Sequence, residues 1–201
     1  RFEVEVFYMK LIIASSNKNK IAEIKEMLNN IEIMSLSDIG FNDEIEETGK
    51  TFEENALIKA QTIYKKYNVP VIADDSGLCV NALNGAPGIY SHRFAGLECN
   101  DEKNNALLIK KMQGIKDRSA YYECVICYFD SKPHFFKGQI HGEIIDVARG
   151  HNGFGYDPYF LIPSLNKTMA EMSMEEKNKI SHRHLATERL GVFLNELSSN
   201  I

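Results

Sequence analysis

Three adjacent side chains in this sequence could do chemistry: Asp74, Asp75 and Ser76. They follow the apolar run at residues 69–72 and precede Gly77, so we predict that they lie where a buried strand ends and the chain turns. Carboxylates at a strand end can take a proton from water or bind a hard metal ion. Because successive strand side chains point to opposite faces, we expect one aspartate in a site and the other in a structural role. The alternative is an ordinary polar turn, since Asp, Ser and Gly are common turn formers.

A second polar segment follows the first predicted strand. Its side chains supply hydroxyls, amides and two lysine ammonium groups, and the residues are Ser15, Ser16, Asn17, Lys18, Asn19 and Lys20. Helical periodicity begins at residue 20, so these groups meet the free N–H groups of a helix start, which is an environment suited to phosphate. The alternative, which the residues support equally, is a solvated turn that caps the helix.

An acidic stretch precedes the strongest predicted helix. It contains Glu44, Glu46 and Glu47, and a capping box at residues 51–54 then opens the helix. These carboxylates are either a solvated charge run or hard-oxygen metal ligands. The segment Gly-Lys-Thr at residues 49–51 imitates the end of a P-loop, but the first glycine of that motif would stand at position 44, which is Glu. We therefore reject a P-loop.

A glycine-rich segment at residues 149–158 surrounds two aromatic side chains. Three glycines frame Phe154, Tyr156 and Asp157, and glycine allows a backbone to approach a ligand closely. An exposed aromatic face beside a carboxylate would suit a planar ligand. The alternative is a turn whose aromatic side chains pack into the core.

The elements that must position these residues are predicted from periodicity, capping signals and turn residues. We predict strands at residues 10–15, 31–36, 69–73, 119–129 and 134–147. We predict helices at residues 20–29, 51–68, 100–112, 173–180 and 181–197. Gly138 and Gly142 are expected to mark bulges or bends in the last strand. The mixture of strands and helices predicts an α/β fold.

The composition is that of a globular protein. Of 201 residues, 44% are hydrophobic and 25% charged, which allows one sizeable core. The net charge of −5 argues against a nucleic-acid partner, which would need a basic face. No apolar run reaches the roughly 18 residues of a membrane span, so we expect no membrane partner. The four cysteines fit a reducing compartment, and we expect a cytoplasmic protein.

The first eight residues are set apart from the rest. Residues 1–8 alternate apolar with polar side chains and precede Met9. We expect them to be a vector-derived remnant or a non-functional N-terminal extension. On this interpretation a single domain spans residues 9–201.

Six short motifs occur in order along the chain. They are Ser15-x-Asn17-x-x-Lys20, Glu47 to Ala56 with Lys59, Ala73 to Leu78, Gly85 to Ser91, Gly153 to Pro158, and Glu175 to Asn178 with Ser181-His182-Arg183. In this combination the chain resembles the inosine triphosphate pyrophosphatase family, also called HAM1-like or non-canonical purine NTP pyrophosphatases, in its bacterial branch. The resemblance extends from Met9 to the final predicted helix.

The resemblance implies an activity, a fold and an assembly. The activity is Mg²⁺-dependent hydrolysis of ITP, dITP and XTP at the α-β phosphoanhydride to the nucleoside monophosphate and pyrophosphate, which removes these nucleotides from the pool. The fold is an elongated α/β protein with a mixed central sheet flanked by helices and a nucleotide cleft between two lobes. The assembly is a homodimer.

The resemblance also assigns roles to residues of this sequence. Asp75 is the proton acceptor and a metal ligand, Glu47 and Glu46 are further metal positions, and Lys20 is the second catalytic residue. The triphosphate falls to residues 15–20 and to Lys59. Ser76 contacts substrate, and the base is held by Phe154, Gly155, Tyr156, Asp157, Lys177, His182 and Arg183. Asp74 would then point away from the site and brace the turn, which is our own inference from strand alternation.

Donor and acceptor chemistry can explain the choice of base. Hypoxanthine and xanthine present an acceptor at C6, which donors from His182 or Arg183 would favour, whereas the amino group of adenine would leave such a donor unpaired. Guanine must be rejected through its 2-amino group. Two alternatives remain open: a related pyrophosphatase with another substrate preference, and a nucleotide-binding sensor without turnover.

Three positions depart from the usual pattern of the family. They are His92, where a small residue is usual, and Asn166 and His184, where Gly is common.

Overall fold

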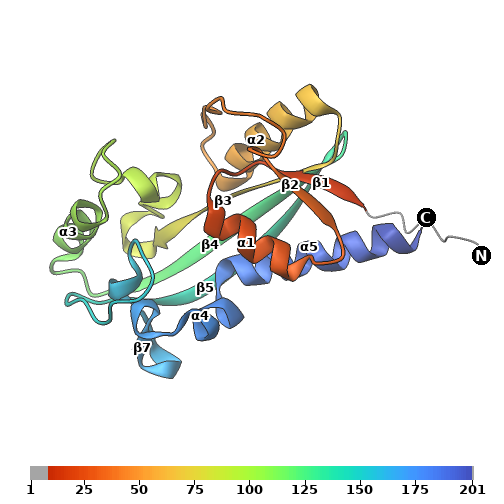
Figure 1. Cartoon of the computed structure of the whole chain (residues 1–201). Coiled ribbons are helices and arrows are strands. Elements are labelled where there is room, and N and C mark those ends of the chain that lie inside the picture. The colour runs from red at the N-terminus through yellow and green to blue at the C-terminus, as the bar shows by residue number, and fades with distance from the viewer. Residues whose placement is uncertain (1–8, 201) are drawn as a thin grey trace, which may run out of the picture. The chain divides into compact units, whose positions relative to one another are not determined.

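The computed structural model describes residues 9–200, in which seven strands form one sheet (Figure 1). The strand order is β2-β1-β3-β4-β5-β6-β7. The strands are β1 (Lys10–Ile13), β2 (Glu32–Ser35), β3 (Val71–Val80), β4 (Ser119–Phe129), β5 (Pro133–Ile144), β6 (Phe160–Ile162) and β7 (Lys167–Thr168). The interpretation of residues 1–8 lies outside the described residues, and the single domain over residues 9–201 stays a prediction.

The helices lie close to their predicted positions. The α-helices between residues 9 and 200 are α1 (Lys18–Met27), α2 (Phe52–Tyr67), α3 (Asp101–Met112), α4 (Met174–Ile180) and α5 (His182–Ser199). Short 3-10 helices occupy Asn81–Leu83, Gly88–Arg93, Asp157–Tyr159, Pro163–Leu165 and Met169–Glu171. None of the helices between residues 9 and 200 combines the length and apolar composition that crossing a membrane requires.

The sheet is mixed, as predicted. Strand β1 pairs in parallel with β2 and β3, whereas β6 pairs antiparallel with β5 and β7. The apolar run of β1 is buried on both faces, which is typical of a parallel strand covered on both sides. The mixed α/β class is therefore confirmed, while the short strands β6 and β7 were missed.

Capping side chains fix where the helices begin. Thr51 Oγ1 accepts a hydrogen bond from the Glu54 backbone N–H at 3.1 Å before α2. Asn100 caps α3 in the same way, and Ser173 forms a complete capping box with Glu176 before α4. These contacts satisfy N–H groups that the first turn of a helix leaves unpaired.

The chain divides into two compact units. Within the described residues, unit 1 consists of residues 9–75, 125–136 and 187–200, and unit 2 consists of residues 76–124 and 137–186. Strands β3, β4 and β5 each contribute residues to both units.

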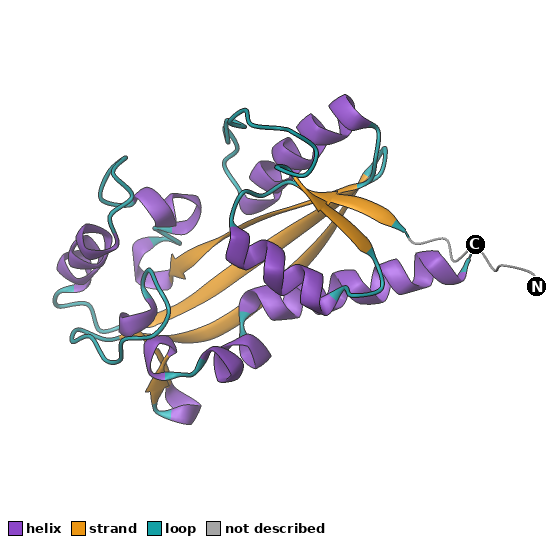
Figure 2. Ribbon diagram, in the orientation of Figure 1, coloured by secondary structure: helices purple, strands orange, loops and turns teal. Residues whose placement is uncertain are grey.

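The core of unit 1 lies on both faces of its strands. On one face, α2 packs Ala56, Ala60 and Ile63 against Ile12 and Val71. Helices α1 and α5 lie on the other face of the strands (Figure 2), and the remaining apolar side chains of β1 and β3 are buried as well. Alternate strand residues therefore face different helices, which decides where the two adjacent aspartates point.

The core of unit 2 gathers around Phe160, whose side chain is fully buried. Side chains from β4, α3 and the segment 156–172 pack around it, among them Tyr122, Leu108 and Met172. Gly142 lies against this aromatic ring, since a Cβ there would stand 2.7 Å from Phe160. Close packing therefore accounts for a glycine at position 142, while the bulge or bend expected there stays a prediction.

The predicted turn at Gly77 is wrong. Strand β3 continues through Asp74, Asp75, Ser76 and Gly77 to Val80. The chain turns later, at Asn84 and Gly85, whose φ values are 54° and 86°. Gly77 is buried within the strand. The polar residues Asp74 to Ser76 therefore lie in the middle of β3 and not at its end.

The resemblance implies a glycine at position 166, and the backbone of Asn166 adopts a conformation that favours glycine. Its φ of 47° and ψ of 38° place it in the left-handed region. Asn is among the few residues other than Gly that adopt this conformation at low cost. The departure is therefore compatible with the local fold.

Candidate functional site

Asp75 lies at the centre of a polar cluster in unit 1. Its side chain is partly buried and its Oδ2 accepts a hydrogen bond from Asn55 Nδ2 at 3.2 Å. Burial raises the pKa of Asp75 to about 6; Lys59 opposes this rise, and the carboxylates of Glu47 and Asp74 add to it. A carboxylate whose pKa lies near neutrality is well matched to taking a proton from water.

Lys59 connects the acidic residues of this cluster. Its Nζ contacts Glu47 Oε1 at 2.6 Å and donates to the Asp74 backbone oxygen at 2.5 Å. Burial disfavours its charge, but the carboxylates of Asp74 and Glu47 outweigh burial and raise the pKa of Lys59. Lys59 is therefore a permanent cation beside Glu47 and Asp75.

Asp74 does not brace a turn as we expected. It is only 4% exposed, and Lys20 Nζ donates to its Oδ2 at 2.9 Å. Asp75 contacts α2 through Asn55, and Asp74 contacts α1 through Lys20, so the predicted alternation holds. The correction concerns the role: Asp74 pairs with a predicted catalytic lysine.

The segment 15–20 is a capped turn in the structure. Asn17 Oδ1 accepts from the backbone N–H groups of Asn19 and Lys20, and Ser15 Oγ accepts from the N–H of Asn17. The cap uses two N–H groups that a phosphate would otherwise take. The side chains of residues 16–19 are exposed and that of Lys20 is half-buried.

The two candidate metal glutamates have different surroundings. Glu47 is half-buried and contacts Lys59, whereas Glu46 is exposed. The negative charge of Glu47 contributes to the raised pKa of Asp75. Among residues 9–200, no group of three or more His, Cys, Asp or Glu side chains is arranged to hold a metal ion alone. Two hard-oxygen carboxylates without a complete cage fit Mg²⁺, which keeps waters and takes further ligands from substrate phosphates.

Asp157 is the centre of a second cluster, in unit 2. Its carboxylate is buried and accepts three hydrogen bonds. Oδ1 accepts from the Tyr122 hydroxyl at 3.1 Å, while Oδ2 accepts from Lys177 Nζ at 2.6 Å and from the Phe154 backbone N–H at 3.2 Å. The charge of this buried carboxylate is thus matched by Lys177 and by two further donors.

The two aromatic residues of the glycine-rich segment behave differently. Tyr156 is 4% exposed, belongs to the core, and donates from its hydroxyl to the Ser91 carbonyl oxygen at 2.6 Å. Phe154 is 67% exposed, and Lys177 Nζ lies 4.8 Å from its ring centroid. The expected packing into the core is confirmed for Tyr156 and the expected exposure for Phe154, whereas the carboxylate of Asp157 is buried. Binding of a planar ligand to the Phe154 ring stays a prediction.

His182 and Arg183 begin helix α5. The ring of His182 stacks on Tyr122 with centroids 5.1 Å apart and an interplanar angle of 13°. Gly138 of β5 lies directly beneath this helix start, since a Cβ there would stand 2.1 Å from the His182 carbonyl oxygen. This close approach requires a glycine at position 138, and the bulge or bend expected there stays a prediction.

Substituting Gly138 by alanine is expected to displace the start of α5. The added Cβ would meet backbone atoms of His182 and Ala186 that cannot move cheaply. We expect a loss of about 2–3 kcal/mol in the free energy of unfolding, measured by denaturant titration. Gly191→Ala is the matched control on the same helix, since its Cβ meets only Leu28 Cδ2 at 3.4 Å. Equal stability of the two variants would contradict the assignment.

Several residues that the sequence did not single out complete the two clusters. Asn55 is 3% exposed, and its Oδ1 accepts from the Gly49 N–H at 2.8 Å while its Nδ2 holds Asp75. Tyr122 contacts both Asp157 and His182. Their partners are distant in sequence, so the apolar periodicity of a helix or strand carries no signal for these contacts.

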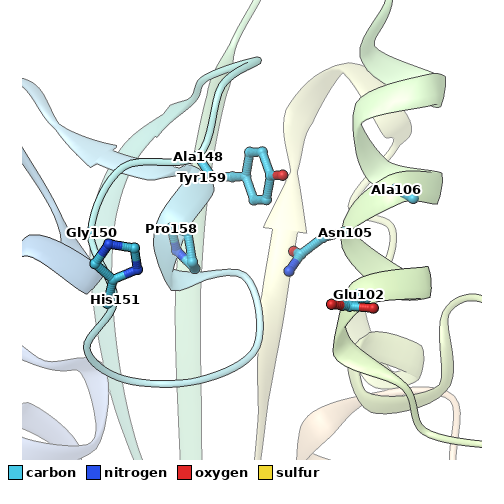
Figure 3. Close-up of a pocket in the computed structure, with 8 residues that line it drawn as sticks. All are labelled: Glu102, Asn105, Ala106, Ala148, Gly150, His151, Pro158 and Tyr159. Carbon is cyan, nitrogen blue, oxygen red and sulfur yellow. The ribbon is translucent and has the colours of Figure 1, made fainter.

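A pocket of about 450 Å³ lies in unit 2, between α3 and the segment 148–159 (Figure 3). Its lining residues were not among the predicted site residues and are Glu102, Asn105, Ala106, Ala148, Gly150, His151, Pro158 and Tyr159. Asn105 links it to the glycine-rich segment, because its Nδ2 donates to the Gly155 carbonyl oxygen at 3.0 Å. Asp101 Oδ2 accepts from the N–H of the same glycine, so α3 fixes Gly155 from both sides.

Comparison with known proteins extends over nearly the whole chain. The model of the Ham1 family matches residues 11–193. A dITP/XTP pyrophosphatase of Bacillus licheniformis is 49% identical over 193 residues, which cover 93% of this chain and 98% of the relative. The structure of the Staphylococcus aureus Ham1 protein is similar with a TM-score of 0.89 at 46% identity, covering 93% and 98% of the two chains. A HAM1 protein from Coxiella burnetii gives a TM-score of 0.90 at 42% identity, covering 94% and 99%.

Proposed function

Because the chain belongs to the Ham1 family, we propose that it hydrolyses non-canonical purine nucleoside triphosphates, namely ITP, dITP and XTP, to the monophosphate and pyrophosphate. The observation that carries this proposal is the Asp75 cluster. It combines a carboxylate whose pKa is raised to about 6 with two lysines and a second carboxylate, Glu47. This is the set that hydrolysis of a phosphoanhydride by water requires.

Each residue of the Asp75 cluster has a role in the proposed reaction. Asp75 orients the attacking water and takes its proton, and Asn55 holds the carboxylate in place. Lys20 and Lys59 supply positive charge for a triphosphate that carries about four negative charges near neutral pH. The proposed contacts of residues 15–19 and Ser76 with substrate belong to the same interpretation.

Mg²⁺ is part of this proposal. Asp75 and Glu47 would hold it, and the exposure of Glu46 makes that residue the weaker candidate. When bound, Mg²⁺ would supply positive charge that stabilises negative charge on phosphate oxygens. The charge of Glu47 raises the pKa of Asp75 even with Lys59 nearby, and a divalent ion between the two carboxylates would favour the charged form of both.

The Asp157 cluster would select the base. Lys177 and the buried Asp157 offer a donor and an acceptor, and Phe154 offers an exposed aromatic face. Donors of His182 and Arg183 would favour the C6 oxygen of hypoxanthine and xanthine over the amino group of adenine. The half-buried His184, next to these residues, is a further candidate for tuning this choice.

The family membership also supports a homodimer acting in the cytoplasm. Nucleoside triphosphates are made and used in that compartment, and an enzyme that clears them would act there. Sedimentation of the purified chain tests the assembly.

A panel of ITP, XTP, dITP, GTP and ATP, each with and without Mg²⁺, tests the function. We expect pyrophosphate from the first three nucleotides and a kcat/KM at least about a hundredfold lower for ATP, because one wrongly paired polar group costs this much or more. Omission of Mg²⁺ should abolish turnover. Preference for a pyrimidine nucleotide would favour a related pyrophosphatase, and tight binding of ITP without pyrophosphate release would favour a sensor.

A further inference from the structure

We infer that Tyr122 is a positioning residue that holds two base-selecting side chains, Asp157 and His182, in a fixed relation. The inference rests on the base-binding role proposed above for these two residues. Tyr122 lies in β4, is 8% exposed, and belongs to the core of unit 2. It therefore acts through its neighbours and does not meet a ligand itself.

The hydroxyl of Tyr122 fixes the carboxylate of Asp157. It donates to Oδ1 at 3.1 Å, while Oδ2 is held by Lys177 and the Phe154 backbone N–H. Burial, together with the charge of Asp157, raises the pKa of Tyr122 well above its ordinary value, so the hydroxyl keeps its proton and remains the donor. With both oxygens held, the carboxylate plane cannot rotate freely.

The ring of Tyr122 fixes the plane of His182. The two rings are nearly parallel, with an interplanar angle of 13° and centroids 5.1 Å apart. On the tyrosine ring the side chain of Phe160 packs with a centroid distance of 4.6 Å, so the ring itself cannot tilt. A histidine whose plane is fixed presents its ring nitrogens in one direction, which is what discrimination between a carbonyl and an amino group requires.

The two residues that Tyr122 contacts, Asp157 and His182, come from different parts of the chain. Asp157 follows the glycine-rich segment, and His182 begins α5. A single buried side chain thus sets the distance and angle between a base acceptor and a base donor. Its hydroxyl should govern affinity for the base, and its ring should govern the choice between purines.

Two substitutions separate these effects. Tyr122→Phe removes only the hydroxyl, and we expect KM and the dissociation constant for dITP to rise about threefold to tenfold, the value of one buried hydrogen bond, with kcat within about twofold. Tyr122→Leu removes the ring as well, and we expect the dITP to dATP ratio of kcat/KM to fall about tenfold below that of Tyr122→Phe. Tyr121→Phe is the matched control, because the neighbouring residue on β4 points to the other face of the sheet.

The measurements are steady-state kinetics, calorimetric titration with dITP and dATP, and thermal unfolding of each variant. A lower melting temperature of Tyr122→Phe with parental KM, dissociation constant and selectivity would overturn the inference, since that is the result of a merely structural tyrosine. If Tyr122→Leu does not fold, Tyr122→Phe against Tyr121→Phe decides alone. Binding without turnover in the parent would contradict the proposed catalysis yet still allow this comparison, and a parent that neither binds nor hydrolyses dITP would contradict both.

Discussion

Replacing Asp75 by asparagine is expected to reduce kcat for dITP by about a thousandfold or more, because the variant loses the proposed general base and a proposed metal ligand together. Asparagine keeps the shape of the side chain and can still accept the hydrogen bond from Asn55 Nδ2. The fold should therefore survive. Pyrophosphate release under saturating Mg²⁺ measures the effect. Near-parental turnover would contradict the proposed catalytic role of Asp75.

The same variant should be more stable than the parent at pH 8 in the absence of divalent ions. The pKa of Asp75 is raised from 3.8 to about 6, so between these values the unfolded chain releases its proton first and stability falls as pH rises. Above pH 6 the full penalty is present, of the order of 2–3 kcal/mol. The neutral amide that replaces the carboxylate carries no such penalty. The advantage of the variant in thermal unfolding should grow from pH 5 to pH 8.

Asp117→Asn is the matched control for both measurements. Asp117 is an exposed aspartate that caps the start of β4, and its hydrogen bonds with Ser119 lower its pKa. Because the sign of its shift is opposite to that of Asp75, substituting it should not stabilise the protein at pH 8, and turnover should be unchanged.

Replacing Lys20 by methionine should affect both activity and stability. We expect kcat/KM for dITP to fall about a hundredfold or more, since a charged contact with the triphosphate is lost. The free energy of unfolding should fall by about 3 kcal/mol, because Asp74 is buried and loses the cation that now lies 2.9 Å from it. Kinetics with dITP and denaturant titration measure the two effects.

A double-mutant cycle with Asp74→Asn tests the coupling. Adding this change to the Lys20→Met variant should restore part of the lost stability but none of the activity. Asp74→Asn alone should raise KM for dITP, because Lys20 is no longer held. Lys10→Met is the matched control, since Lys10 pairs with Glu32 at 3.7 Å on the surface. Additive effects on stability would contradict the pairing.

The sequence predicted the fold well where the signals are local. The capping residues Thr51, Asn100 and Ser173 lie next to the helices that they start. The apolar residues of β1 are consecutive in the sequence, so the strand can be recognised from them alone. The short strands β6 and β7 have three and two residues and too little periodicity to be recognised. The turn predicted at Gly77 is wrong because residue types that often form turns lie inside β3 here. Pairing of β3 with its neighbouring strands keeps them extended.

The sequence predicted the charged residues of the site but not the residues that hold them in place. Asp75, Lys20, Lys59 and Asp157 stand in motifs with an order along the chain, and the structure groups each with other candidates. The pairing of Asp74 with Lys20 spans 54 residues, and the contact of Tyr122 with Asp157 spans 35. Such contacts depend on strand order, which no local pattern encodes.

Asn55 has a consequence for the barrier of the reaction. Its amide cannot rotate by half a turn without losing the hydrogen bond from the Gly49 N–H, so it always presents a donor to Asp75. A carboxylate that had to find its orientation in each catalytic cycle would add that reorganisation to the activation free energy. In the proposed reaction this ordering would be completed once, when the chain folds, and every later turnover would begin from an Asp75 carboxylate that is already aligned.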